Sequence, residues 1–201
     1  MLKNMRLVII ALISSYILLG CASSPSNSGY LPDYARMKPT EHLEEYWANT
    51  QQIKKSAAPN ISLGEVSATG ISDKNNVTVA DCISWLRKGL LEGEAISNDQ
   101  SAAKYRLDAA ITYMDPGSAS ARVWAGELGA GHAKVQIEGK VIDIDSGQLV
   151  ATFAERRDSS GMIGIEDLAG DASPSLINDM ITSISKDVNS ELLSTFSSNS
   201  Y

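Results

Sequence analysis

Few side chains in this sequence of 201 residues are placed for acid–base or metal chemistry. The only histidines, His42 and His132, lie far apart and outside any Cys/His/Glu cluster at zinc-ligand spacing. Asp143 and Asp145 would share one face of a strand, a spacing that would suit the carboxylate pair of a glycosidase. They also flank a Ser146-Gly147 turn, where Asp commonly bonds to the backbone. We favour the turn, and we assign no catalytic residue, metal ligand or cofactor.

The segment from 122 to 133 is the most conspicuous local pattern, because it combines Arg122, Trp124 and His132 with three glycines. A nucleotide-binding loop would open a helix, whereas these glycines precede a predicted strand and no P-loop Lys-Ser/Thr follows them. Trp and Arg are enriched at interaction hot spots. We therefore predict an interaction surface at Arg122, Trp124, His132 and Arg157; the alternative is a core tryptophan with solvated arginines.

The segment before Cys21 has the three zones of an export signal: a positive start, an apolar run and a small residue, Gly20. The run over residues 7–19 is shorter than the roughly 20 residues that span a bilayer as a helix. Residues 18–21, Leu-Leu-Gly-Cys, resemble a bacterial lipobox. In proteins with a lipobox the cysteine thiol receives a diacylglycerol, the chain is cut before it, and the new amine is acylated. We expect residues 1–20 to be a signal peptide and Cys21 to be lipidated.

Residues 21–32 are mostly small and polar, and we predict that they form a flexible tether. Ala22 stands where an inner-membrane retention signal usually carries Asp, which favours the outer membrane of a Gram-negative host. We therefore expect one periplasmic domain over residues 33–198, attached to the membrane through its lipid. The alternatives are an ordinary secretory signal and a buried N-terminal helix.

The charge balance of the mature chain excludes some partners. Loss of residues 1–20 removes two of the 17 basic residues and none of the 24 acidic ones, which leaves a net charge of −9. Nucleic-acid binding needs a basic surface, so we expect no nucleic acid partner. Cys82 is then the single free cysteine; we expect it to pack as a small hydrophobe rather than act as a nucleophile or form an intermolecular bridge.

The elements that must position these residues follow from apolar spacing. Alternation of period two predicts strands over 61–69, 105–113, 133–144 and 149–156, the last two joined as a hairpin at Asp145-Ser146-Gly147. Helical spacing predicts helices over 41–55, from the Thr78 cap to the stop at Gly93, and from Ser173-Pro174 onward. The order predicts an α+β fold, a mainly antiparallel sheet with helices packed on one face.

Two segments carry a family resemblance. The Arg122–Ala133 stretch, the strand after it and residues 141–151 resemble an uncharacterised family of Gram-negative envelope lipoproteins, in which an Arg/Gly-Ala-Gly segment precedes a strand ending in an Asp-x-x-Ser/Thr-Gly turn. Residues 29–37 resemble the Gly-Phe-Leu-x-x-Tyr-x-x-Leu start of a related lipoprotein family. The resemblance implies an envelope lipoprotein with a small α+β domain, and it transfers no catalytic residue.

From these patterns we expect an outer-membrane-anchored lipoprotein that binds an envelope protein and is not an enzyme. The alternative is a cell-envelope enzyme acting on wall glycan or peptide, with His132 or the Asp143/Asp145 pair as acid and base. A third hypothesis is a binder of a soluble ligand at the Trp124 surface.

Overall fold

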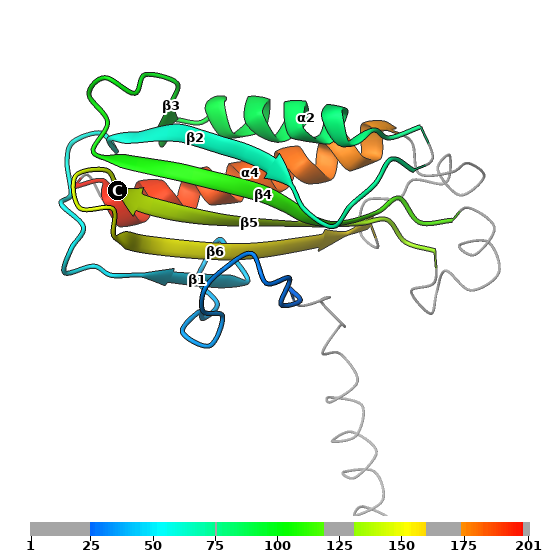
Figure 1. Ribbon diagram of the computed structural model, residues 1–201, viewed down its shortest axis with the longest axis horizontal. Helices are drawn as coiled ribbons and strands as arrows, with labels where there is room; N and C mark the ends of the chain where they lie inside the picture. The colour runs from blue at the N-terminus through cyan, green and yellow to red at the C-terminus, as the bar shows by residue number, and fades with distance from the viewer. Residues whose placement is uncertain (1–24, 75, 119–130, 160–173, 199–201) are drawn as a thin grey trace, which may run out of the picture.

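The computed structural model describes residues 25–74, 76–118, 131–159 and 174–198. Within these residues six strands form one sheet, in the order β1-β6-β5-β4-β2-β3 (Figure 1). The strands are β1 (Glu45–Ala48), β2 (Ile61–Ala68), β3 (Ile96–Ser97), β4 (Tyr105–Asp115), β5 (Lys134–Asp143) and β6 (Leu149–Asp158). The helices are α2 (Val79–Leu91) and α4 (Pro174–Phe196), and both pack on the same face of the sheet.

The predicted α+β class is confirmed, and so are the four longer strands and the two later helices. Strands β1, β6, β5 and β4 pair antiparallel, whereas β2 pairs in parallel with both β4 and β3. Helix α2 forms the crossover between β2 and β4, and such a crossover is what a parallel pair requires. The sheet is therefore mixed and mostly antiparallel.

The helix predicted over residues 41–55 is wrong. Thr40 does accept a hydrogen bond from the Leu43 amide at 3.1 Å, as a cap would, but the chain then continues into β1 along the edge of β6. There Tyr46 points into the core, while Trp47 packs on the opposite face. Aromatic residues suit a half-buried strand, and pairing with a sheet edge outweighs a weak helical preference.

Helix α2 begins as its sequence predicts and ends against α4. The Asp81 amide donates to the Thr78 side chain at 3.0 Å, which confirms Thr78 as the N-cap. Near the other end a Cβ at Gly93 would lie 2.1 Å from Asn189. The Asn189 amide group donates to the Leu90 carbonyl and accepts from the Ala95 amide, so the missing side chain at Gly93 lets α4 hold the end of α2.

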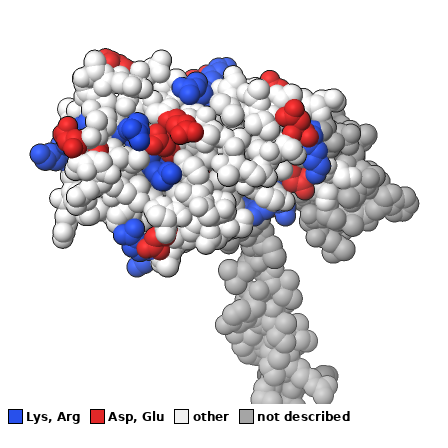
Figure 2. Space-filling model, viewed as in Figure 1, with Lys and Arg blue, Asp and Glu red and all other residues white. Residues whose placement is uncertain are grey.

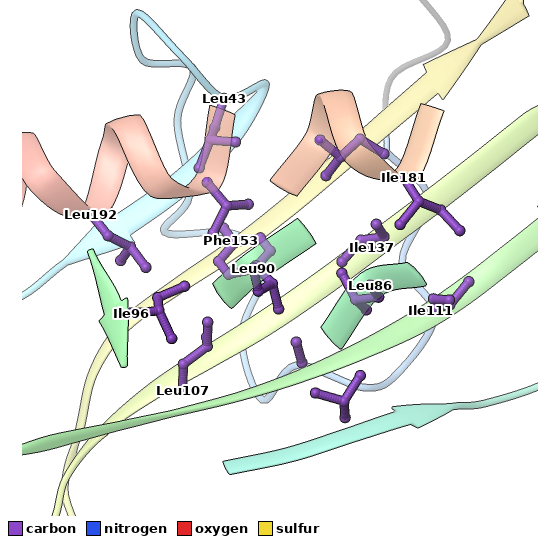
Figure 3. Close-up of a cluster of buried hydrophobic side chains, with 14 of the residues drawn as sticks. Leu43, Leu86, Leu90, Ile96, Leu107, Ile111, Ile137, Phe153, Ile181 and Leu192 are labelled. Atoms are coloured by element: carbon purple, nitrogen blue, oxygen red, sulfur yellow. The ribbon is translucent and has the colours of Figure 1, made fainter. Parts of the chain in front are cut away.

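The main core lies between the helices and the sheet (Figure 3). It takes every second residue of β4 and β5, including Leu107, Ile111 and Ile137, all fully buried. The helices add side chains at the expected three- and four-residue spacings, including Leu86, Leu90, Ile181 and Leu192. Among the described residues, no helix has both the length and the apolar composition needed to cross a membrane.

Candidate functional site

The face of the sheet away from the helices, here called the outer face, carries buried polar side chains. Gln136 and Glu138 of β5 alternate with the core residues of that strand, and Thr112 lies beside them on β4. Gln136 and Glu138 are both fully buried. Buried polar groups must be hydrogen-bonded, so this face needs a cover that supplies partners.

The cover is the N-terminal segment of residues 25–37, here called the strap. It supplies the buried Leu31 and Met37, which form a second, small apolar cluster with Ala154 of β6 and the half-buried Trp47 of β1. Figure 1 shows this segment in blue, crossing the sheet on the side away from α2 and α4. The strap begins within the predicted tether of residues 21–32, so Ser26 and Leu31 of that range contact the domain rather than extend from it.

One strap side chain satisfies the buried carboxylate. The Tyr34 hydroxyl donates to Glu138 Oε2 at 2.6 Å, while Thr112 and Gln136 donate to Oε1 at 2.8 and 2.7 Å. Hydrogen bonds to a charged acceptor are stronger than neutral ones. Glu138 therefore ties the strap to β4 and β5.

A second contact fixes the first residues of the strap. The Ser26 amide donates to Gln136 Oε1 at 2.9 Å, and Gln136 Nε2 donates to the Ser26 carbonyl at 2.7 Å. The side-chain amide of Gln136 thus pairs with the Ser26 backbone as a neighbouring strand would. We call this pair of bonds the clamp; it lies near the start of β5.

A groove lies where the strap meets β1 and α4. Its walls come from three separate segments, with Arg36 and Lys38 from the strap side, Trp47 and Thr50 around β1, and Thr195 from α4. Its volume is about 670 Å³ and it is open to solvent. The guanidinium of Arg36 stacks 4.1 Å from the centre of the Trp47 ring. An exposed cation beside an aromatic ring is a combination found at binding surfaces.

The predicted interaction surface lies only partly within the described residues. Arg122, Trp124 and the predicted lipidation site Cys21 fall outside them. His132 is half-buried just before β5, in a shallow hollow with Lys74, Asp115 and Lys134.

Arg157 is near the end of β6, but its guanidinium is bound within the fold. It forms ion pairs with the fully buried Glu155 and with Asp187 of α4, at 2.5 Å from the latter. These pairs support a structural role for Arg157, whereas the alternative interpretation of the sequence expected a solvated charge.

The acidic pair belongs to the β5–β6 turn. Asp143 Oδ1 accepts hydrogen bonds from the Ser146 amide and hydroxyl, and Oδ2 lies 3.0 Å from Lys104 Nζ. These contacts lower the pKa of Asp143 to about 2, chiefly through the Ser146 amide and then through Lys104. Asp145 binds the same ammonium at 2.9 Å. Both contacts agree with the turn interpretation that we favoured.

Cys82 packs as expected, fully buried on the core face of α2 with its thiol 3.4 Å from Met114 Sδ. Burial raises the pKa of this thiol to about 11. Among the described residues no three His, Cys, Asp or Glu side chains are grouped as metal ligands. Figure 2 shows acidic and basic side chains mixed over the visible face, without a patch of one sign.

The residues that join the strap to the sheet, Gln136, Glu138 and Tyr34, were not predicted from the sequence. Alternation along β5 predicts a polar face, and polar faces of antiparallel sheets usually meet water. A signal was nevertheless present: Tyr30, Leu31, Tyr34 and Met37 put large side chains into a stretch with neither helical nor strand period, so these side chains needed a surface to cover.

The chain is similar in structure to several solved proteins. These include a PelC dodecamer from Paraburkholderia phytofirmans, with 14% identity over 76% of this chain and 98% of that one and a TM-score of 0.42. A Xanthomonas campestris protein of the DUF330 family has 13% identity over 72% and 93% and a TM-score of 0.45. A Chlamydia trachomatis protein has 9% identity over 67% and 98% and a TM-score of 0.40.

No curated protein matches the sequence. A family model described as a domain of unknown function, DUF4410, matches residues 53–161, more than half of the chain. The match includes β2 to β6 and the Asp143–Gly147 turn, which is one of the segments that carried the resemblance to an uncharacterised family. This chain belongs to the DUF4410 family.

Proposed function

We propose that this chain is an outer-membrane-anchored periplasmic lipoprotein whose α+β domain is a non-catalytic binding module of the cell envelope. The observation that carries the proposal is the Leu-Leu-Gly-Cys motif at residues 18–21. It lies only a few positions before Ser26, the first of the described residues that bonds to the sheet. A lipid on Cys21 would therefore hold the domain directly at a membrane. Several acyl chains give stable anchoring, since each buried methylene contributes about 0.8 kcal/mol.

Replacement of the lipidation site tests the anchor. Cys21→Ala should leave the circular dichroism spectrum and urea midpoint of the domain unchanged while moving it from the membrane to the soluble fraction. Mass spectrometry of the wild-type N-terminal peptide should show Cys21 carrying diacylglycerol and an amide-linked acyl chain. An unmodified Cys21, or a Cys21→Ala variant still wholly in membranes, contradicts the anchor.

The Arg36–Trp47 groove supports the binding role, because three segments build it and it remains open. A photo-crosslinking side chain at the exposed Thr50 should capture an envelope protein in intact cells, and Arg36→Ala should reduce that capture. The same side chain at Ser84, exposed on α2, is the matched control. Release of product from wall glycan or peptide by the purified chain, abolished by His132→Ala or Asp143→Ala in a folded protein, would contradict the non-catalytic part.

A further inference from the structure

The clamp limits how far the domain can move from its anchor. Ser26 is held to the sheet through both its backbone amide and its carbonyl. It lies five positions after Cys21, and five residues of fully extended chain span at most about 18 Å. A lipid on Cys21 therefore lies within about that distance of Gln136. This inference rests on the lipidation proposed above.

Gln136 marks one end of the sheet. It lies two residues after the start of β5 and pairs with Tyr113 near the end of β4 and with Arg156 near the end of β6. We call this the His132 end. The β5–β6 turn is at the other end, seven residues further along β5, or about 23 Å at 3.3 Å per residue. The span from Gln136 to the turn is longer than the chain that joins Ser26 to the anchor.

The clamp also lies on one face. Gln136 points to the outer face with Glu138, whereas α2 and α4 cover the opposite face. A helix is about 10 Å across. The solvent-facing side of α2 is therefore separated from the clamp by the sheet and by the full width of the helix. The mature chain is acidic, which disfavours adsorption of other faces to anionic lipid.

We propose that the outer face at the His132 end lies against the phospholipid headgroups, and that the helices and the turn end project away from the membrane. The length of chain between Cys21 and the clamp sets this orientation. It leaves the exposed side of α2 and the Asp143–Gly147 turn facing away from the headgroups.

Quenching of site-specific fluorophores by the membrane tests the orientation. The lipidated full chain carries a single added cysteine at Lys134 on the outer face of the His132 end, at Ser84 on α2 or at Ile144 in the turn. The vesicles contain phosphatidylethanolamine and phosphatidylglycerol with a nitroxide on a fraction of the headgroups. We expect several-fold stronger quenching at K134C than at S84C or I144C. Equal quenching at the three positions, or strongest quenching at Ser84 or Ile144, overturns the orientation.

Two variants test the cause without altering the core. Twelve Gly/Ser residues inserted between Ser24 and Pro25 raise the maximum reach to about 60 Å. Ser26→Pro removes the amide donor of the clamp at an exposed residue. Both should reduce the difference between K134C and S84C, and a difference that persists in both overturns the role of the clamp. Failure of the wild type to associate with vesicles would instead refute the proposed anchor, since Cys21→Ala provides the unanchored reference.

Discussion

Phe153 of β6 occupies the space beside Gly139, its direct partner on β5. A Cβ at Gly139 would lie 2.2 Å from the Phe153 ring, which is fully buried. Phe153 contributes to the core beneath the helices, and the glycine lets its ring approach the neighbouring strand closely. The ladder between β5 and β6, which carries both Gln136 and Glu138, thus depends on a glycine opposite an aromatic residue.

Gly139→Ala should lower the free energy of unfolding by about 1 to 3 kcal/mol, because the new methyl group overlaps a ring that has no free space to enter. Urea unfolding followed by circular dichroism measures the change. Gly139→Ala should cost less stability in a Phe153→Leu background than in the wild type, since the smaller side chain makes room for the methyl group. Additive losses in the double variant would show that the two residues do not compete for space.

Tyr34→Phe should loosen the strap. The variant leaves the buried Glu138 without one of its three donors, at a cost of about 1 to 3 kcal/mol. Leu31, whose amide donates to the Tyr34 hydroxyl, should exchange its amide hydrogen faster than in the wild type. Tyr30→Phe removes a hydroxyl from the same segment, for which the described residues show no hydrogen bond, and is the control. Unchanged exchange at Leu31 would contradict the bonding of strap to sheet.

Asp143 should stabilise the fold in a pH-dependent manner. Its folded pKa of about 2 is below the ordinary 3.8, so the stabilisation is complete above about pH 4 and is lost as the pH falls toward 2. Asp143→Asn should therefore cost roughly 1 to 2 kcal/mol at pH 7 and almost nothing near pH 2. Asp145→Asn, at a side chain 82% exposed, should have little effect at either pH. Urea midpoints across this range provide the comparison; a loss independent of pH would rule out the carboxylate charge as the cause.

Arg157→Ala should destabilise the domain by about 3 kcal/mol or more, because it leaves the buried Glu155 without a cationic partner. Adding Glu155→Gln should recover part of the loss, because the remaining buried group is then neutral. Thermal unfolding of both variants measures the change. An Arg157→Ala domain as stable as the wild type would show that the ion pairs of Arg157 do not stabilise the fold.

The thiol of Cys82 should be unreactive in the native protein. Full burial excludes reagents, and a pKa of about 11 leaves almost no thiolate at neutral pH. A chromogenic disulfide reagent should modify Cys82 at least about a hundredfold more slowly in the native protein than in the urea-unfolded protein, because the thiol reacts only after unfolding. Rapid native labelling would show that α2 opens at its core face.

The order of the elements could be predicted from the sequence where local signals were strong. The β5–β6 hairpin has turn residues between two alternating strands, and α2 has a capping threonine before an apolar face. Both signals depend on residues within a few positions of one another, so no tertiary contact is needed to interpret them.

The helix predicted over residues 41–55 was wrong because local signals there do not distinguish a helix from a strand. Leu43, Tyr46 and Trp47 fit a helical face as well as a short strand, and the choice depended on the free edge of β6, which lies about 100 residues away. The parallel pairing of β2 with β4 was likewise invisible, because alternation shows which residues face the core and not which strand is the neighbour.

For the site, the sequence by itself determined the candidate anchor at Cys21 and the polar face of β5. Only the tertiary structure decided what covers that face. Ser26 and Gln136 are separated by 110 positions, and their pairing follows from the need of a buried amide for hydrogen-bond partners once the strap excludes water from the sheet. Local patterns encode which groups are polar, whereas burial, which makes those groups bind one another, arises only when distant segments pack together.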